Sequence, residues 1–177
     1  RPFGVGFSKC LYAATRCVVT SGGQRVDIDT EAALARALIT VEQVPASEAI
    51  NGTRVDLYAV DLPDLGTRVE ELCLGFPVAV LFNGQPLKRP LAEGHLATQA
   101  SPIGAVHLAG TLDGKYSYET MVFLQGFCVL KPTYCLRDEL NVVHLDSRQF
   151  MARLPDRDKL IDEDVQRKRI DAELKAC

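Results

Sequence analysis

Two glycines separated by one residue constrain the beginning of this chain more than any other feature does. Gly4 and Gly6 are followed by apolar residues at helical spacing: Phe7, Cys10, Leu11 and Ala14. A glycine turn at the start of a helix leaves backbone N–H groups unpaired at the positive end of the helix dipole, an arrangement that favours phosphate. The alternative is a glycine turn that only starts a helix, because G-x-G is common by chance.

The residues around this turn resemble one segment of the ninety-kilodalton heat-shock chaperones. Residues 3–8, Phe-Gly-Val-Gly-Phe-Ser, are similar to the F-G-V-G-F-Y-S run that closes over the ATP phosphates in that family. Arg16–Ser21 is similar to the V-x-V-x-S strand that follows the next helix. These chaperones belong to the GHKL ATPase superfamily, together with gyrase, histidine kinases and MutL. The resemblance implies a cofactor site with phosphate-binding backbone N–H groups, formed by Phe3, Gly4, Val5, Gly6 and Phe7.

The next part of the chain alternates between strands and one short helix. Cys17–Thr20 and Arg25–Ile28 flank a Gly-Gly hairpin signal, and Thr30 is a candidate cap for a helix that runs to Leu38. Residues 39–44 alternate between apolar and polar side chains and end at Pro45, which predicts a further strand.

Gly52-Thr53 opens a strand in which Val55, Leu57 and Ala59 face one way, as in a sheet covered on one side. The resembling ATPases place a G-T dipeptide at this point. The resemblance therefore implies that Thr53 lies under the nucleotide base and helps to hold a carboxylate and a water. The alternative is a β-branched residue that only starts a strand.

Residues 75–87 predict a buried strand followed by an Asn-Gly turn, and they resemble the last strand of the chaperone ATPase domain. Beyond residue 87 the resemblance ends. A loop is predicted at 88–102, and residues 103–108 and 116–129 are predicted to pair as a hairpin around Asp113-Gly114. Residues 156–175 predict an amphipathic helix with dense charge pairs, which either faces solvent or contacts a partner.

The predicted fold class is α+β: an α/β sandwich whose mixed, mainly antiparallel sheet carries helices on one face. Residues 1–90 would form the C-terminal part of a GHKL (Bergerat-type) ATP-binding domain, and 91–102 a linker. Residues 103–177 would form a smaller α+β region, comparable with the transducer domain of the superfamily, ending in the charged helix. None of Lys115, Lys131 and Arg148 matches the transducer lysine motif, so these three residues have no predicted role.

Composition narrows the classes of partner. The formal net charge of the 177 residues is −3, which argues against a nucleic-acid-binding surface spread over the whole chain. No apolar run approaches the ~20 residues of a membrane span, and we expect no membrane partner. Six cysteines without a C-x-x-C and three histidines without metal-ligand spacing indicate a reduced, cytoplasmic protein.

Two acidic motifs that the resembling ATPases need do not occur in these 177 residues. They are the E-x-x-x-N helix, which activates water and coordinates Mg²⁺, and the D-x-G-x-G run, which reads adenine. The chain also begins without Met, inside the glycine loop, which indicates a piece of a longer polypeptide. We therefore expect part of an ATP-gated conformational switch, with Mg²⁺ held mainly by residues outside this chain. Its partners would be the rest of its polypeptide and a homo-oligomer or multi-chain assembly. The alternative is a structural module of such an assembly, for instance a viral particle, that binds no nucleotide.

Overall fold

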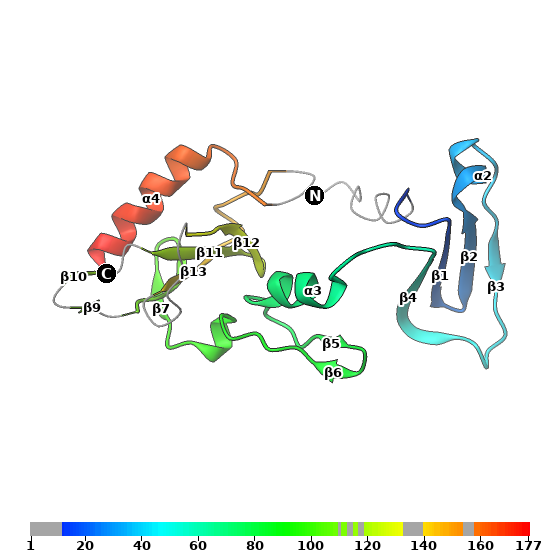
Figure 1. The fold of residues 1–177 in the computed structure, drawn as a ribbon, viewed down its shortest axis with the longest axis horizontal. Helices are drawn as coiled ribbons and strands as arrows, with labels where there is room; N and C mark the ends of the chain where they lie inside the picture. Colours follow the sequence, from blue (N-terminus) through cyan, green and yellow to red (C-terminus); the bar gives the residue numbers. More distant parts are fainter. Residues whose placement is uncertain (1–11, 110, 113–114, 117–118, 133–139, 154–157) are drawn as a thin grey trace. The chain divides into compact units, whose positions relative to one another are not determined.

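The computed structural model describes residues 12–109, 111–112, 115–116, 119–132, 140–153 and 158–177. The fold is α+β, with mainly antiparallel strands and few helices in the described residues, which confirms the predicted class (Figure 1). The chain divides into two compact units, Arg1–Pro63 and Asp64–Cys177. The linker predicted at residues 91–102 falls inside the second unit.

The first unit is built on an antiparallel sheet of four strands in the order β3-β2-β1-β4. Its elements are β1 (Arg16–Gly22), β2 (Gln24–Asp29), α2 (Thr30–Leu34), β3 (Val41–Gln43) and β4 (Ile50–Tyr58). The β1–β2 hairpin turns at Gly22, whose φ of +57° suits glycine. The predicted hairpin is therefore confirmed.

Helix α2 differs from its prediction at both ends. The N-cap is Asp29, whose carboxylate accepts a hydrogen bond of 2.8 Å from the backbone N–H of Ala32. The Thr30 hydroxyl instead donates to the carbonyl of Ala14 at 2.6 Å. The helix ends at Leu34, and Arg36 has a φ of +62°, a left-handed conformation that cannot continue a helix.

The second unit is built on a five-stranded sheet in the order β12-β11-β13-β8-β7, in which β11 and β13 are parallel and the other pairs antiparallel. Its elements are α3 (Leu65–Cys73), β5 (Leu81–Phe82), β6 (Gln85–Pro86), the 3₁₀ turn η1 (Glu93–His95), β7 (Gln99–Ser101), β8 (Gly104–His107), β9 (Thr111–Leu112), β10 (Lys115–Tyr116), β11 (Thr120–Leu124), β12 (Phe127–Leu130), β13 (Asn141–Leu145) and α4 (Glu163–Ala176).

Both faces of this second sheet are covered, so its central strands are apolar on both sides. On one face Val122, Val143 and neighbouring residues pack under Ile170 of α4, which is 2% exposed. On the other face Phe123 and Val142 pack under Leu74 and Leu91, which come from the segment between α3 and η1. The core of the second unit therefore has two layers, one on each side of the sheet.

The prediction of a buried strand at residues 75–82 is wrong. Val78 and Leu81 are 58% and 68% exposed, and this stretch contains only the two-residue strand β5. The segment lies over the second sheet instead of joining it, as the edge-to-face contact of Phe76 with Phe127 shows. The Asn-Gly turn is confirmed, because Asn83 and Gly84 both have positive φ, at 51° and 78°.

The pairing predicted between residues 103–108 and 116–129 is wrong, but the antiparallel hairpin around Asp113-Gly114 is present: β9 and β10 pair, with Leu112 opposite Lys115 and Thr111 opposite Tyr116. Strand β8 pairs with β13 and β7, and β11 pairs with β12 and β13. The run at 116–129 is divided by Gln125-Gly126, whose positive φ values of 53° and 86° form a two-residue turn. The Asp113-Gly114 turn itself lies outside the described residues.

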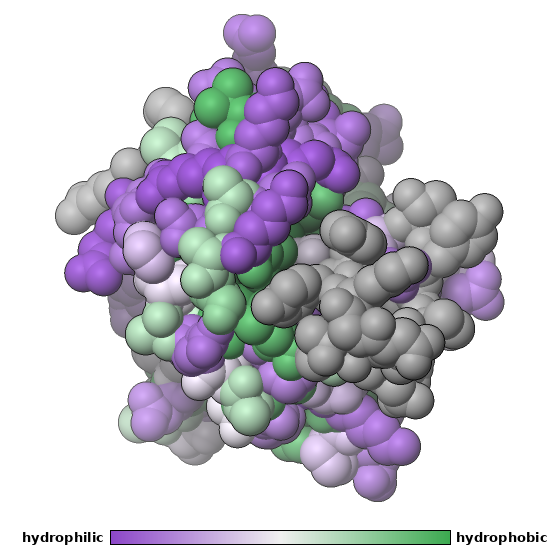
Figure 2. Space-filling view, turned by 90° about the vertical axis from the view of Figure 1, so that its left-hand side faces the viewer, coloured by the Kyte–Doolittle hydropathy of each residue, from purple (hydrophilic) through white to green (hydrophobic). Residues whose placement is uncertain are grey.

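Helix α4 begins at Glu163, seven residues later than the pattern predicts, and Leu160 before it forms an isolated bridge with Ala152. Most of the helix is polar, and Val165 is 65% exposed. The surface on this side of the protein is mostly hydrophilic, with hydrophobic side chains showing in patches between the polar ones (Figure 2).

Candidate functional site

One of the predicted site residues lies in the described part of the chain. Thr53 is on β4, directly opposite Ser21 of β1, and their hydroxyl oxygens Oγ1 and Oγ are 2.9 Å apart. The Ser21 hydroxyl also lies 3.4 Å from the Gly52 carbonyl, to which it can donate. Phe3, Gly4, Val5, Gly6 and Phe7 lie outside the described residues, so their predicted contact with phosphate stays a prediction.

The hydroxyl pair lies at one end of the apolar face of the first sheet. The register places these apolar side chains on one face: Cys17, Val19, Val26, Ile28, Val41, Val55 and Leu57. Gln24 and Gln43 lie beside Ser21 at the same end. Val55 and Leu57 remain 43% and 37% exposed. The hydroxyl pair of Ser21 and Thr53 therefore borders the exposed apolar surface of Val55 and Leu57. Such a site could bind a flat heterocycle, which needs an apolar surface for its faces and hydrogen bonds at its edge.

The opposite, charged face of the same sheet is occupied by paired ions. Its three arginines each contact a carboxylate: Arg16 with Asp27, Arg25 with Glu48, and Arg54 with Asp56. They surround a depression of about 370 Å³ whose floor includes Val18 and Thr20.

The ion pairs of this face also stabilise the charged forms of their side chains. The hydrogen bonds between Arg16 and Asp27 raise the pKa of the guanidinium and lower the pKa of the carboxyl. Arg16 also lies over the ring of Tyr58, 5.1 Å from its centroid. Among the described residues, this face therefore offers no unpaired arginine to a phosphate, and the apolar face is the better candidate for a nucleotide.

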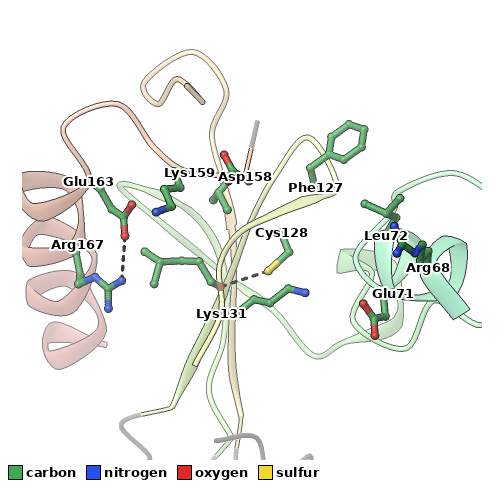
Figure 3. Close-up of a pocket in the computed structure, with 12 residues that line it drawn as sticks. Arg68, Glu71, Leu72, Phe127, Cys128, Lys131, Asp158, Lys159, Glu163 and Arg167 are labelled. Atoms are coloured by element: carbon green, nitrogen blue, oxygen red, sulfur yellow. Dashed lines mark hydrogen bonds and ion pairs between the residues drawn. The ribbon is translucent and has the colours of Figure 1, made fainter. Parts of the chain in front are cut away.

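A groove of about 570 Å³ in the second unit is bordered by α3, β12 and α4 (Figure 3). Its side chains carry mixed charge, with Glu163 and Arg167 joined by an ion pair of 3.1 Å. Burial raises the pKa of the Cys128 thiol, whose Sγ donates to the Leu130 carbonyl at 3.4 Å. The unreactive thiol form therefore dominates at neutral pH, and Cys128 is a packing residue of this groove.

A second depression in this unit, about 560 Å³, contains His144 and Asp146. The Nε2–H of His144 donates to the Leu91 carbonyl at 2.8 Å, because a carbonyl only accepts, and the ring stacks on Phe123 at 5.2 Å. Hydrogen bonds from Arg148 lower the pKa of Asp146 to about 2. Both side chains thus have structural partners, and the sequence contained no spacing that would have singled them out.

Lys115, Lys131 and Arg148, which had no predicted role, lie in three different places in the second unit. Arg148 is paired with Asp146, Lys131 lines the groove of Figure 3, and Lys115 lies in β10. Ser21 is the site residue that the prediction missed, although the V-x-V-x-S resemblance had already included its position.

Comparison with known proteins adds no assignment: no protein-family model matches this chain, and no curated protein is significantly similar to it. In the described part of the chain, no group of three or more His, Cys, Asp or Glu residues is placed to hold a metal ion. None of the described helices is long and apolar enough to cross a membrane.

Proposed function

We propose that this chain is part of an ATP-binding, nucleotide-gated conformational switch of GHKL, heat-shock-chaperone-like type, within a longer protein. One observation carries the proposal: the hydroxyls of Ser21 and Thr53 meet at 2.9 Å, although 32 positions separate the two residues in sequence. Ser21 belongs to the strand motif after the glycine loop and Thr53 to the separate G-T motif. Both motifs resemble segments of the same ATPase site, and their contact in this structure supports the proposal that they form one site here as well.

In this proposal the apolar face of the first sheet receives the nucleotide base. The exposed apolar side chains of Val55 and Leu57 fit a heterocycle, and the Thr53 hydroxyl supplies a hydrogen bond at its edge. The backbone N–H groups of residues 4–7 would hold the phosphates. The bound ATP–Mg²⁺ would supply the phosphoryl group and the charge that drives switching. The water-activating Glu and the Mg²⁺-coordinating Asn are assigned to residues outside this chain.

The test is ATP affinity, measured by titration calorimetry on the complete polypeptide that carries this chain. Thr53→Val keeps the shape of the side chain and removes its hydroxyl. Losing that hydrogen bond should cost about 0.5–1.5 kcal/mol, or about 2- to 13-fold in affinity. Thr53→Ser retains the hydroxyl and should bind ATP nearly as the natural protein does.

Two results would contradict the assignment. If Thr53→Val binds ATP with unchanged affinity but melts at a lower temperature, Thr53 is a structural residue of β4. If the natural polypeptide binds no ATP at all, the structural-module alternative replaces the switch.

A further inference from the structure

Strand β4 forms one edge of the first sheet (Figure 1). It is nine residues long, contains neither Pro nor Lys, and in the described part of the chain pairs only with β1. An edge strand exposes a row of unpaired backbone N–H and C=O groups that can pair with another strand. Natural edges are usually blocked by proline, charged side chains, above all lysine, a bulge or short length, and the two charged residues of this edge are Arg54 and Asp56. A β-bulge interrupts the pairing of β4 with β1 at Ile50–Thr53, whereas the stretch from Thr53 to Tyr58 pairs regularly with β1 and contains no Pro or Lys.

The charges along this edge are self-complementary. Arg54 and Asp56 lie two positions apart on the same face of β4, with Val55 between them on the other face. If a second copy of β4 pairs antiparallel about Val55, Arg54 of each copy lies opposite Asp56 of the other. A shift by two residues would place Arg54 opposite Arg54, or Asp56 opposite Asp56, and like charges directly opposite are destabilising.

The other face of β4 agrees with the same register. Pairing about Val55 places the two Val55 side chains opposite each other and Thr53 opposite Leu57. Val55 and Leu57 are 43% and 37% exposed, so pairing would bury apolar surface. A shift by one residue would set charged side chains opposite apolar ones, which disfavours it. Both faces therefore favour one register.

We propose that β4 is a homodimerisation edge, at which two copies of this chain pair antiparallel about Val55 and join their four-stranded sheets into one. In the dimer, Arg54 exchanges its bond to Asp56 of its own strand, 2.9 Å long, for a bond to Asp56 of the second copy. A single strand pair buries little surface, so the dimer is weak and depends on concentration. The pairing is a separate function from nucleotide binding and requires no nucleotide, although it involves Thr53, Val55 and Leu57 of the proposed nucleotide site.

The test is analytical ultracentrifugation of the 177-residue chain over a wide range of concentrations. Arg54→Asp and Asp56→Arg each create two like-charge contacts across the two-fold axis, so each should weaken association by about tenfold or more. The double variant Arg54→Asp/Asp56→Arg restores opposite charges and should associate as the natural chain does. Asp171→Arg changes an exposed charge of α4 by the same amount and should leave association unchanged.

A second measurement reads the register directly. In a Cys177→Ser background, Val55→Cys should form a disulfide-linked dimer under mild oxidation, because the two introduced thiols face each other. Leu57→Cys should form it much more slowly, since its partner position is Thr53. A natural chain that stays monomeric at every concentration would overturn the proposal. Failure of the double variant to restore association, or equal cross-linking at both positions, would overturn it as well.

Discussion

Burial changes the titration of His144, near the middle of the second sheet. Its ring stacks on Phe123 of β11, and its Nε2–H donates to the Leu91 carbonyl in the segment that covers this face. Burial lowers the pKa of the imidazole, while the bond to Leu91 and the charge of Glu93 oppose that shift. The neutral ring is therefore the form that the folded protein holds.

This shift predicts how stability depends on pH. Because the folded pKa lies below the unfolded value of about 6.5, the unfolded chain binds the proton more readily. The free energy of unfolding should therefore fall as pH decreases from 7.5 to 5. His144→Gln keeps a donor without titrating and should show a shallower fall, measured by urea unfolding at both pH values. Identical slopes would contradict the role of His144.

The partly buried carboxyl of Asp146 should not interfere with this measurement. Its pKa is lowered from 3.8 to about 2 by Arg148. Any stability from that pairing is present above the unfolded pKa and is lost only as pH falls toward 2. The window from 7.5 to 5 therefore isolates the imidazole from this carboxyl.

Among the elements, the segment between α3 and η1 depends on a close approach at Gly75. A Cβ atom built on Gly75 would lie 2.3 Å from Cδ1 of Phe123, whose side chain is 1% exposed. The ring is fixed in the core and cannot move aside easily. Glycine at this position therefore lets the covering segment lie directly on the sheet.

Gly75→Ala should destabilise the protein by about 1–3 kcal/mol, because it overpacks this core layer. Gly94→Ala is the matched control, since a Cβ at Gly94 meets no atom within 4 Å. Chemical denaturation of both variants measures the difference. Equal stabilities would show that the segment shifts away from Phe123 without cost.

Local patterns predicted the elements that their own residues determine. The β1–β2 hairpin and β4 follow from Gly-Gly turn chemistry and from alternation, and the structure contains both. The prediction of a buried strand at residues 75–82 failed on both counts, because an apolar run alone settles neither burial nor strand formation: Val78 and Leu81 are exposed, and the segment lies over the sheet. The strand order of the second sheet could not be predicted from local patterns either, because β8 pairs with β13, which is distant in sequence, and not with β11.

For the whole molecule, we expect the 177-residue chain alone neither to hydrolyse ATP nor to bind it tightly. It contains the proposed phosphate loop and Thr53, but no E-x-x-x-N and no D-x-G-x-G. Without a group that activates water, the rate should fall by about 10²–10⁴-fold. A phosphate-release assay should compare the chain alone with the complete polypeptide. Turnover by the chain alone, above a heat-inactivated control, would place the catalytic groups within these residues.

The candidate site was predictable only in part. Thr53 was found because resemblance singles out a G-T dipeptide, and its place at the edge of an apolar face agrees with the alternation of Val55 and Leu57. Its contact with Ser21 was not predictable, because it depends on β4 returning antiparallel beside β1 across 32 positions. Such pairing between distant strands is a tertiary property that no short window contains.

The central place of β13 has a consequence for synthesis of the chain. Residues 141–145 are the last strand of the second unit, yet they lie between β8 and β11. A growing chain can pair β7 with β8 and β11 with β12 as hairpins, but it cannot join them until β13 has left the ribosome. The first sheet is complete once β4 has emerged. We therefore expect the first unit to fold during translation before the second unit, whose sheet cannot be completed until β13 has been synthesised.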